Sequence, residues 1–291
     1  MNWNTNKSKF IYFLIFLPIA VLVGYLISQH QQFDREEDFE WEIWVRNSVE
    51  ITGYTGANTI IRIPRKIQGM PILSIYHNAF YEMGLTRVIF PRRSNLGGIG
   101  NRAFMRNQIK HVTIPSRTTI PRGIISIGDW AFAENGLTSL TLQRGLGIIS
   151  DWAFALNQLS DLRIPDSVHY IGTAAFAINQ LNSVNIPNSV TFIGDRAFAQ
   201  NRLTQVTIPN RLTTIKGQTF AWNYLTEISI PDSVTFIGKE AFAGNQLTKI
   251  TIGSYVTMEE DGGFGPAFYE FYKSNGYRAG IYLYNGDDWG F

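Results

Sequence analysis

Side chains capable of catalysis or tight metal binding are scarce in this sequence. Cysteine is absent, and the four histidines lie far apart, at His30, His77, His111 and His169. The lack of cysteine excludes disulfides, thiolate metal sites and cysteine nucleophiles. Four scattered histidines leave few candidates for metal binding or acid–base chemistry. We therefore predict no catalytic residues, no metal site and no cofactor.

The sequence motifs of common enzyme classes are missing as well. The chain contains no G-x-S-x-G, no H-E-x-x-H, no phosphate-binding loop and no dinucleotide-binding fingerprint. Its acidic residues fall on expected strand or turn positions, without a second carboxylate at a spacing typical of paired acid catalysts. We predict that the protein is not an enzyme.

Polar and charged residues suited to binding recur instead at a regular spacing. Asp161, Gln205, Glu227 and Lys249 are separated by 44, 22 and 22 residues. A column of outward residues that varies in size and charge is typical of a protein-binding surface. The alternative is that each is simply a solvated strand residue. The predicted ligand contacts are Arg87, His111, Asp161, Arg163, Gln205, Glu227 and Lys249.

The spacing comes from a unit of about 22 residues that occurs eight times. An isoleucine precedes a phenylalanine by five residues in every unit, and an asparagine follows it by three residues in seven units. The repeat phenylalanines are Phe80, Phe104, Phe132, Phe154, Phe176, Phe198, Phe220 and Phe242. One such unit cannot bury a core alone, but a stack of eight can.

The apolar, glycine and asparagine positions of each unit predict that it forms one coil of a stack. Leu159, Leu162 and Ile164 exemplify the apolar residues of a first strand that point inward, and a second apolar pair covers the opposite side of the coil. Glycines such as Gly194 permit a turn that other residues would strain. The asparagine amide is expected to bond backbone groups of its own turn and of a neighbouring one, forming a ladder.

This unit is similar to the leucine-rich repeats of the BspA type, as found in treponemal and other surface proteins of anaerobic bacteria. The resemblance covers about residues 51–252 and rests on all eight units. It implies a right-handed, β-rich solenoid with short helical turns and with strands on the concave face. It also implies surface display, binding of a protein or of host matrix, and no enzyme activity. Many family members carry cysteine where this chain has asparagine.

Two tryptophans form a second candidate site. Trp130 and Trp152 both lie two residues before the repeat phenylalanine, in consecutive units, so their rings should be neighbours. The other units carry mostly polar residues there, which indicates a solvent-facing position. Two stacked, exposed indoles could bind a sugar ring or an apolar edge of a partner. The alternative is mutual packing that stabilises the edge of the coil.

The N-terminal residues predict a membrane segment. Residues 10–28 carry no charge and would span roughly 29 Å as a helix at ~1.5 Å per residue. Lys7 and Lys9 precede them, which favours an N-terminus inside and the rest of the chain outside. A cleaved signal peptide is the alternative, although Leu26-Ile27-Ser28 is a poor cleavage site. Either way the body of the chain is exported.

The predicted organisation has five parts. Residues 1–9 are cytoplasmic, 10–28 form the signal anchor, and 29–48 form an acidic, aromatic spacer. Residues 49–252 form the repeat domain, with an insertion at 116–121, and 253–291 form a C-terminal cap. Phe264, Phe268 and Tyr272 fall at helical spacing in that cap. An alternating run at 281–284 then leads into Asn285-Gly286, a hairpin signal.

Composition narrows the choice of partner. The net charge of +2 implies no global polyanion, and an exported chain makes nucleic acid an unsuitable partner. The leading hypothesis is a membrane-tethered protein of the bacterial cell envelope that binds a protein or matrix ligand, or a glycan, through its concave strand face. The alternative is a periplasmic envelope scaffold without a host ligand, because an inner-membrane helix does not reach the outer surface of a cell with two membranes.

Overall fold

The computed structural model describes residues 34–45, 47–92, 94–116, 125–259 and 262–290. The chain divides into two units, Met1–Arg35 and Glu36–Phe291. The predicted cytoplasmic residues and the predicted membrane segment, 1–28, lie outside the described residues, as does nearly all of the predicted insertion at 116–121. Within the described ranges, no helix has both the length and the apolar character needed to cross a membrane.

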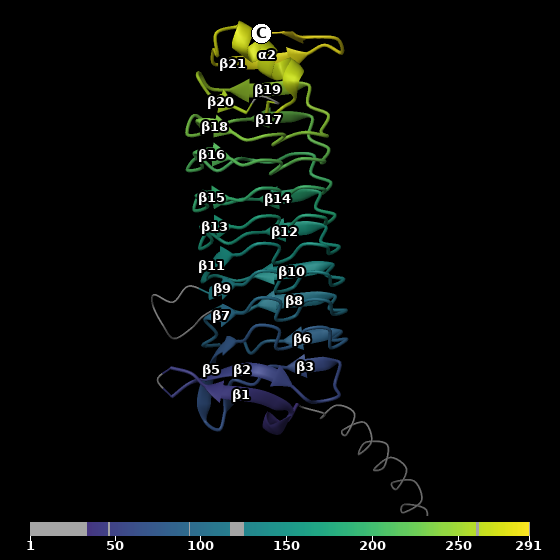
Figure 1. Ribbon diagram of the computed structural model, residues 1–291, viewed down its shortest axis with the longest axis vertical. Helices are drawn as coiled ribbons and strands as arrows, with labels where there is room; N and C mark the ends of the chain where they lie inside the picture. The colour runs from purple at the N-terminus through teal and green to yellow at the C-terminus, as the bar shows by residue number, and fades with distance from the viewer. Residues whose placement is uncertain (1–33, 46, 93, 117–124, 260–261, 291) are drawn as a thin grey trace, which may run out of the picture. The chain divides into compact units, whose positions relative to one another are not determined.

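The second unit is a stack of coils, most of which carry two short strands (Figure 1). The first strands form one column: β3 Ile60–Arg62, β6 Arg87–Ile89, β8 His111–Ile114, β10 Ser139–Leu142, β12 Asp161–Arg163, β14 Ser183–Asn185, β17 Glu227–Ser229 and β19 Lys249–Ile252. The second strands form another: β5 Met70–Ile75, β7 Gly98–Ile99, β9 Ile125–Ile127, β11 Leu146–Ile149, β13 Tyr170–Ile171, β15 Phe192–Ile193, β16 Thr214–Ile215, β18 Phe236–Ile237 and β20 Thr257–Met258.

Strands of one column that are hydrogen-bonded to each other run parallel: β3 with β6, β8 with β10, β12 with β14 and β17 with β19 among the first strands, and β5 to β15 and β16 to β20 among the second strands. Asp161 pairs with Ser183 on the first strands, and Ile171 pairs with Ile193 on the second. Alternation along the first strand leaves Leu162 and Ile164 buried while Asp161 and Arg163 are exposed. The inward positions predicted from the repeat are therefore confirmed, and the second strands show that the opposite side of the coil is also a parallel sheet.

A continuous stack of phenylalanine rings fills the centre of the coils. Neighbouring rings from Phe80 to Phe242 lie nearly parallel, with centroids 4.9 to 5.7 Å apart. Phe264 adds a further ring at 4.8 Å from Phe242. The prediction that Phe264 belongs to a helix is wrong, because it lies before α2 (Pro266–Ser274) and completes the stack. The solenoid has about nine turns rather than eight.

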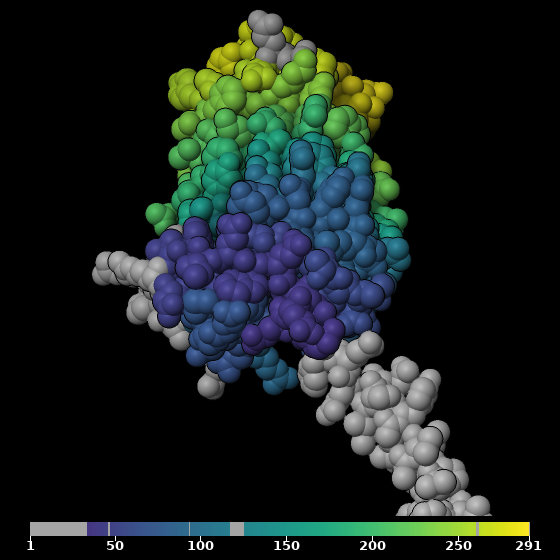
Figure 2. All heavy atoms as spheres, turned by 60° about the horizontal axis from the view of Figure 1, so that its bottom comes forward, coloured from purple at the N-terminus to yellow at the C-terminus, as the bar shows by residue number. Residues whose placement is uncertain are grey.

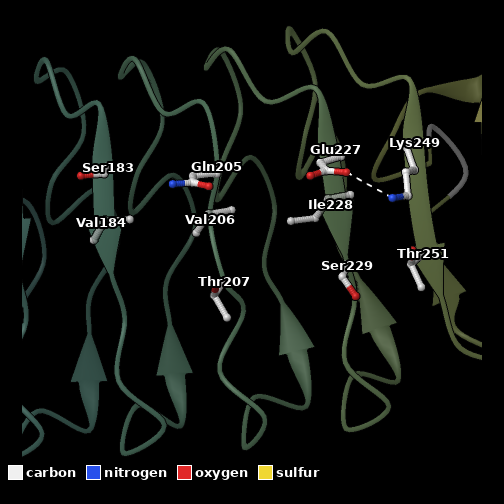
Figure 3. A pocket seen from close by; sticks show the side chains of 10 residues that line it. All are labelled: Ser183, Val184, Gln205, Val206, Thr207, Glu227, Ile228, Ser229, Lys249 and Thr251. Carbon is white, nitrogen blue, oxygen red and sulfur yellow. Dashed lines mark hydrogen bonds and ion pairs between the residues drawn. The ribbon is translucent and has the colours of Figure 1, made fainter.

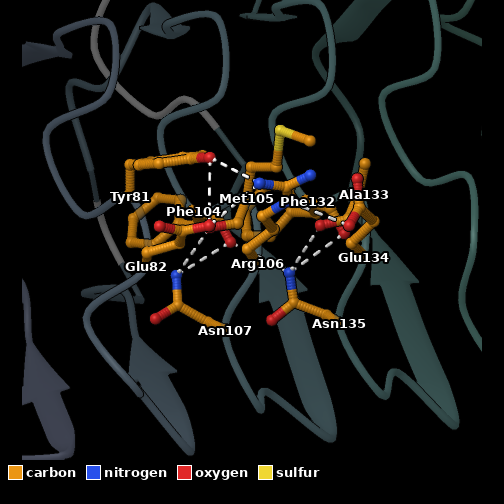
Figure 4. Close-up of polar contacts among 10 residues, drawn as sticks. All are labelled: Tyr81, Glu82, Phe104, Met105, Arg106, Asn107, Phe132, Ala133, Glu134 and Asn135. Carbon is orange, nitrogen blue, oxygen red and sulfur yellow. Dashed lines mark hydrogen bonds and ion pairs between the residues drawn. The ribbon is translucent and has the colours of Figure 1, made fainter.

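The asparagine ladder is present and links each coil to the one before it. The Asn179 Nδ2 group donates to the Phe176 carbonyl of its own coil at 3.2 Å and to the Phe154 carbonyl of the preceding coil at 3.0 Å. Its Oδ1 accepts the Leu159 N–H at 3.1 Å. Asn107 and Asn135 make the same bonds within and between coils, and Figure 4 shows the bonds that each amide makes within its own coil. Each amide thus satisfies backbone groups that water cannot reach.

The turns around each phenylalanine differ from the expected helical turns. Ala174 and Ile178 flank Phe176 and have left-handed backbones, with φ of 51° and 56°. Gly194, in contrast, is not left-handed; a Cβ there would lie 2.5 Å from the Thr173 backbone nitrogen of the preceding coil. The glycine is therefore explained by close approach of two coils and not by a strained turn.

Both ends of the stack are covered. At the N-terminal end, β1 (Phe39–Ile43) and β2 (Val49–Tyr54) form an antiparallel hairpin after the short 3-10 helix η1 (Glu36–Asp38). The buried Phe39 ring lies 6.5 Å from Phe80, so part of the predicted spacer packs on the first ring of the stack. Figure 2 shows this end of the stack, with the residues of the hairpin in purple at its surface. The strand β4 (Lys66–Ile67) pairs with β5.

At the C-terminal end, α2 and a hairpin form the cover. The hairpin consists of β21 (Gly280–Tyr284) and β22 (Trp289–Gly290), as the alternating run predicted. β21 pairs antiparallel with β19 and so extends the first-strand column by one more strand. Tyr272 of α2 is buried, and its hydroxyl donates to the Gly253 carbonyl at 2.6 Å.

We expect Asn179→Ala to lower the free energy of unfolding by about 2–4 kcal/mol, because it leaves two buried carbonyls and one buried N–H without this partner. Asn179→Asp should be at least as harmful, since a carboxylate cannot donate to the carbonyls. Urea unfolding followed by circular dichroism measures both. The exposed Asn185→Ala is the control and should change stability by less than about 0.5 kcal/mol. Equal effects of Asn179→Ala and Asn185→Ala would contradict a role for the ladder.

Candidate binding surface

The outward side of the first-strand column, here called the first-strand face, carries the predicted ligand contacts. Strand side chains alternate in direction, so every second residue of β6, β8, β12, β17 and β19 faces solvent. In-register pairing then sets equivalent residues of consecutive coils side by side, as for Glu227 and Lys249. Residues that lie 22 positions apart in the sequence are therefore neighbours on the sheet. The two outward positions of each strand form two adjacent columns along the face.

Three hollows lie along this face and together include all seven predicted contacts. Arg87 and His111 line the first, of about 590 Å³. Asp161, Arg163 and Gln205 line the second, of about 550 Å³. Gln205 also lines the third, of about 480 Å³, with Glu227 and Lys249 (Figure 3). The structure thus places these residues on one face, but it divides them among three hollows.

Polar contacts on the face are few and exposed. Lys249 Nζ lies 3.3 Å from a Glu227 carboxylate oxygen, and the two side chains are 45% and 65% exposed. An exposed pair of this kind contributes little to stability, so both charges can be used to bind a partner. His111 Nδ1 lies 2.8 Å from the Ser139 hydroxyl of the next coil.

The C-terminal hairpin gives this face an apolar end that sequence reasoning missed. Ile281 pairs with Thr251 and Leu283 with Lys249, so both apolar side chains lie in the two outward columns. They are 51% and 53% exposed. The alternation at 281–284 predicted a strand, but nothing in it indicated that the strand would pair with β19.

Trp130 and Trp152 are stacked, as predicted. Their ring centroids are 4.5 Å apart and the ring planes differ by 1°. Both residues have left-handed backbones and both are partly buried, so the expectation of a solvent-facing position holds only in part. They follow β9 and β11 and line none of the three hollows. The structure therefore separates the tryptophan pair from the first-strand face.

A second aromatic pair lies on the second-strand column. Tyr170 and Phe192 stack with centroids 4.6 Å apart and parallel planes. Partial burial raises the pKa of the Tyr170 hydroxyl above its usual value, and the negative charges of Asp151 and Asp129 raise it further. The phenol therefore stays protonated, and this pair offers aromatic surface beside carboxylates.

Exposed apolar residues also occur in the turns that follow the repeat phenylalanines, and they were not predicted from the sequence. Ile178 and Trp222 occupy the position two residues after the phenylalanine and are 37% and 43% exposed. Tyr224, two residues later, is 51% exposed. The departure of these residues from the polar side chains of other units was the available signal. Among the described residues, no group of three or more histidine, aspartate or glutamate side chains is arranged to hold a metal ion.

The sequence also matches the model of a known repeat family. Six copies of the BspA type leucine rich repeat region match residues 59–120, 73–201, 116–225 and 214–266, which together span well over half of the chain. The chain belongs to the BspA-type leucine-rich repeat family. Solenoids of this family are typically binding proteins without catalytic activity. None of the curated proteins matches the sequence.

Several solved structures are similar to the chain. A leucine-rich repeat protein of T. pallidum is 20% identical, with 71% of this chain and 86% of that chain covered and a TM-score of 0.44. The pneumococcal vaccine antigen PcpA is 19% identical, with coverages of 75% and 80% and a TM-score of 0.42. A leucine rich cell surface protein of Faecalibacterium prausnitzii is 22% identical, with coverages of 79% and 90% and a TM-score of 0.32.

A stabilising role of the Trp130–Trp152 stack can be measured independently of any ligand. A double-mutant cycle on Trp130→Ala and Trp152→Ala should give a coupling free energy of about 1 kcal/mol, because each indole loses its partner face. Urea unfolding of both single variants and the double variant measures it. The control cycle pairs Trp130→Ala with Trp222→Ala, which lies several coils away and should be additive. Additivity in the first cycle would leave the pair without a stabilising role.

Proposed function

We propose that this protein is an exported, membrane-anchored envelope protein that binds a protein or matrix ligand through its first-strand face. The observation that carries the proposal is the contrast between a fixed interior and a varied exterior. Every coil buries the same phenylalanine, whereas the outward position changes between basic, acidic and neutral residues from coil to coil. Packing alone explains the constant positions, and recognition of an irregular partner explains the variable ones.

The hollows support this use of the surface. They make the surface uneven, and the exposed side chains of Asp161, Glu227 and Lys249 line them, which supports contact with a partner there. Leu283 lies beside Lys249 and supplies an apolar contact next to the charged pair. Burial of such an exposed apolar side chain against a partner favours association.

Anchoring and export rest on the sequence of residues 10–28 and the lysines that precede it. We propose a single-pass signal anchor with the solenoid outside the cytoplasm. An adhesin that contacts a host and an envelope scaffold that contacts a neighbouring protein both fit such an arrangement. They differ in where the solenoid is displayed.

Replacement of Asp161, Glu227 and Lys249 together by alanine should weaken ligand binding at least tenfold without unfolding the coils, because all three are surface residues. The full-length chain in detergent is tested against immobilised fibronectin, fibrinogen, laminin and collagen by surface plasmon resonance. The matched control replaces Asp232, Glu270 and Lys273, which carry the same charges away from this face, and should leave binding unchanged. Equal affinity of the two triple variants for every bound protein would refute the first-strand face as the site.

Protease treatment of intact cells tests whether the solenoid is displayed on the cell surface. An antibody against the solenoid detects cleavage. Surface exposure predicts cleavage from outside and favours the matrix-binding function. Protection until the outer envelope is opened favours the periplasmic scaffold. A cytoplasmic protein that is held in the membrane as a control should stay intact in both cases.

A further inference from the structure

The first hollow of the first-strand face has an unusual charge composition. It lies across β6, β8 and β10 and is lined by Arg87, Arg92 and His111, with Ser139, Thr141 and Gln143 on its polar wall. No carboxylate is among the residues that line it. The third hollow, in contrast, contains the paired Glu227 and Lys249. The face is therefore cationic in its N-terminal half only.

The surrounding strands reinforce this charge. The segments that contain the first four strands of the column, residues 59–66, 85–92, 109–116 and 137–144, include basic residues but no aspartate or glutamate. The first carboxylate along the outward column is Asp161. Several cations close together, without neighbouring anions to neutralise them, produce a positive potential that attracts polyanions.

Most apolar residues that line the hollow are buried. Val88, Phe90 and Val112 are 3%, 8% and 3% exposed, because they point into the core. The accessible groups are therefore mainly guanidinium, imidazole, hydroxyl and amide groups, with the Ile89 side chain as a partly exposed apolar group among them. A protein partner would usually insert apolar or aromatic side chains at the centre of its interface. A hydrophilic polymer with strong anions needs none, and guanidinium groups bind oxyanions such as sulfate through paired hydrogen bonds.

We propose that the hollow formed by Arg87, Arg92 and His111 binds a sulfated glycan. This inference rests on the proposed function, in that it assigns a matrix ligand to one half of the same face. The sulfate groups contact the arginines, while the sugar hydroxyls bond Ser139, Thr141 and Gln143. Binding is driven mainly by charge, so it weakens steeply as salt rises.

The test uses the full-length chain in detergent and a heparin octasaccharide, with a fully desulfated octasaccharide and a poly-glutamate peptide as comparison probes. Titration calorimetry at low and high salt gives the affinities. Arg87→Ala with Arg92→Ala should reduce heparin affinity at least tenfold. Arg202→Ala with Arg211→Ala removes the same charge from exposed positions that line none of the three hollows, and should have little effect. Urea midpoints verify that both variants are folded.

Three results would overturn the proposal: no heparin binding by the unaltered chain, equal losses in both double variants, or equal affinity for poly-glutamate. The last would assign the hollow to an acidic peptide instead. Matrix-protein binding by the Asp161, Glu227 and Lys249 variant is measured in parallel. If heparin fails but that variant loses matrix-protein binding, only the glycan assignment falls and the proposed function stands.

Discussion

The structure depends on the need of each coil to satisfy its buried backbone groups through the coil beside it. A turn of 22 residues has too little interior to bond its own carbonyls and N–H groups. One asparagine side chain per coil meets that need, because its amide donates to two phenylalanine carbonyls and accepts one N–H across the interface between coils. The amide is uncharged and supplies two N–H donors and an acceptor oxygen, whereas serine has only one donor and an ionised aspartate has none. The aromatic stack and the two parallel sheets follow from the spacing that this bond requires.

One asparagine amide and one phenylalanine ring recur in the interior of the coils. The side chains at the outward strand positions do not pack in that interior, so their identity can change without disturbing it. Asp161 and Ser183 occupy the same position in paired strands, yet they differ in charge. This freedom permits a face with a cationic hollow at one end, the Glu227–Lys249 pair toward the other, and apolar side chains from β21 beside it. The charge and polarity of the outward side chains can therefore vary along the face without any change in the fold.

Much of this architecture could be predicted from the sequence, because repetition shows which positions are equivalent. The buried first-strand residues, the asparagine ladder and the Trp130–Trp152 stack follow from positions that recur from unit to unit, and the C-terminal hairpin follows from the alternation at 281–284. Contacts that the recurrence of positions does not specify could not be predicted in this way. The role of Gly194 is an example, since its neighbour is Thr173, one coil away. The pairing of β21 with β19 and the division of the face into hollows are others, because both arise from the three-dimensional arrangement of segments that share no pattern.

The first coil differs from the others in one residue. Met83 stands where seven later coils carry asparagine, and its side chain is 38% exposed. No amide therefore joins the first coil to the β1–β2 hairpin, which is held by strand pairing and by the contacts of Phe39 and Tyr54 with Phe80. Opening of the solenoid at this end therefore breaks no asparagine bond of this kind. The arginine-lined half of the face therefore lies near the end that lacks this bond, whereas the half near Glu227 lies between coils that Asn223 and Asn245 join.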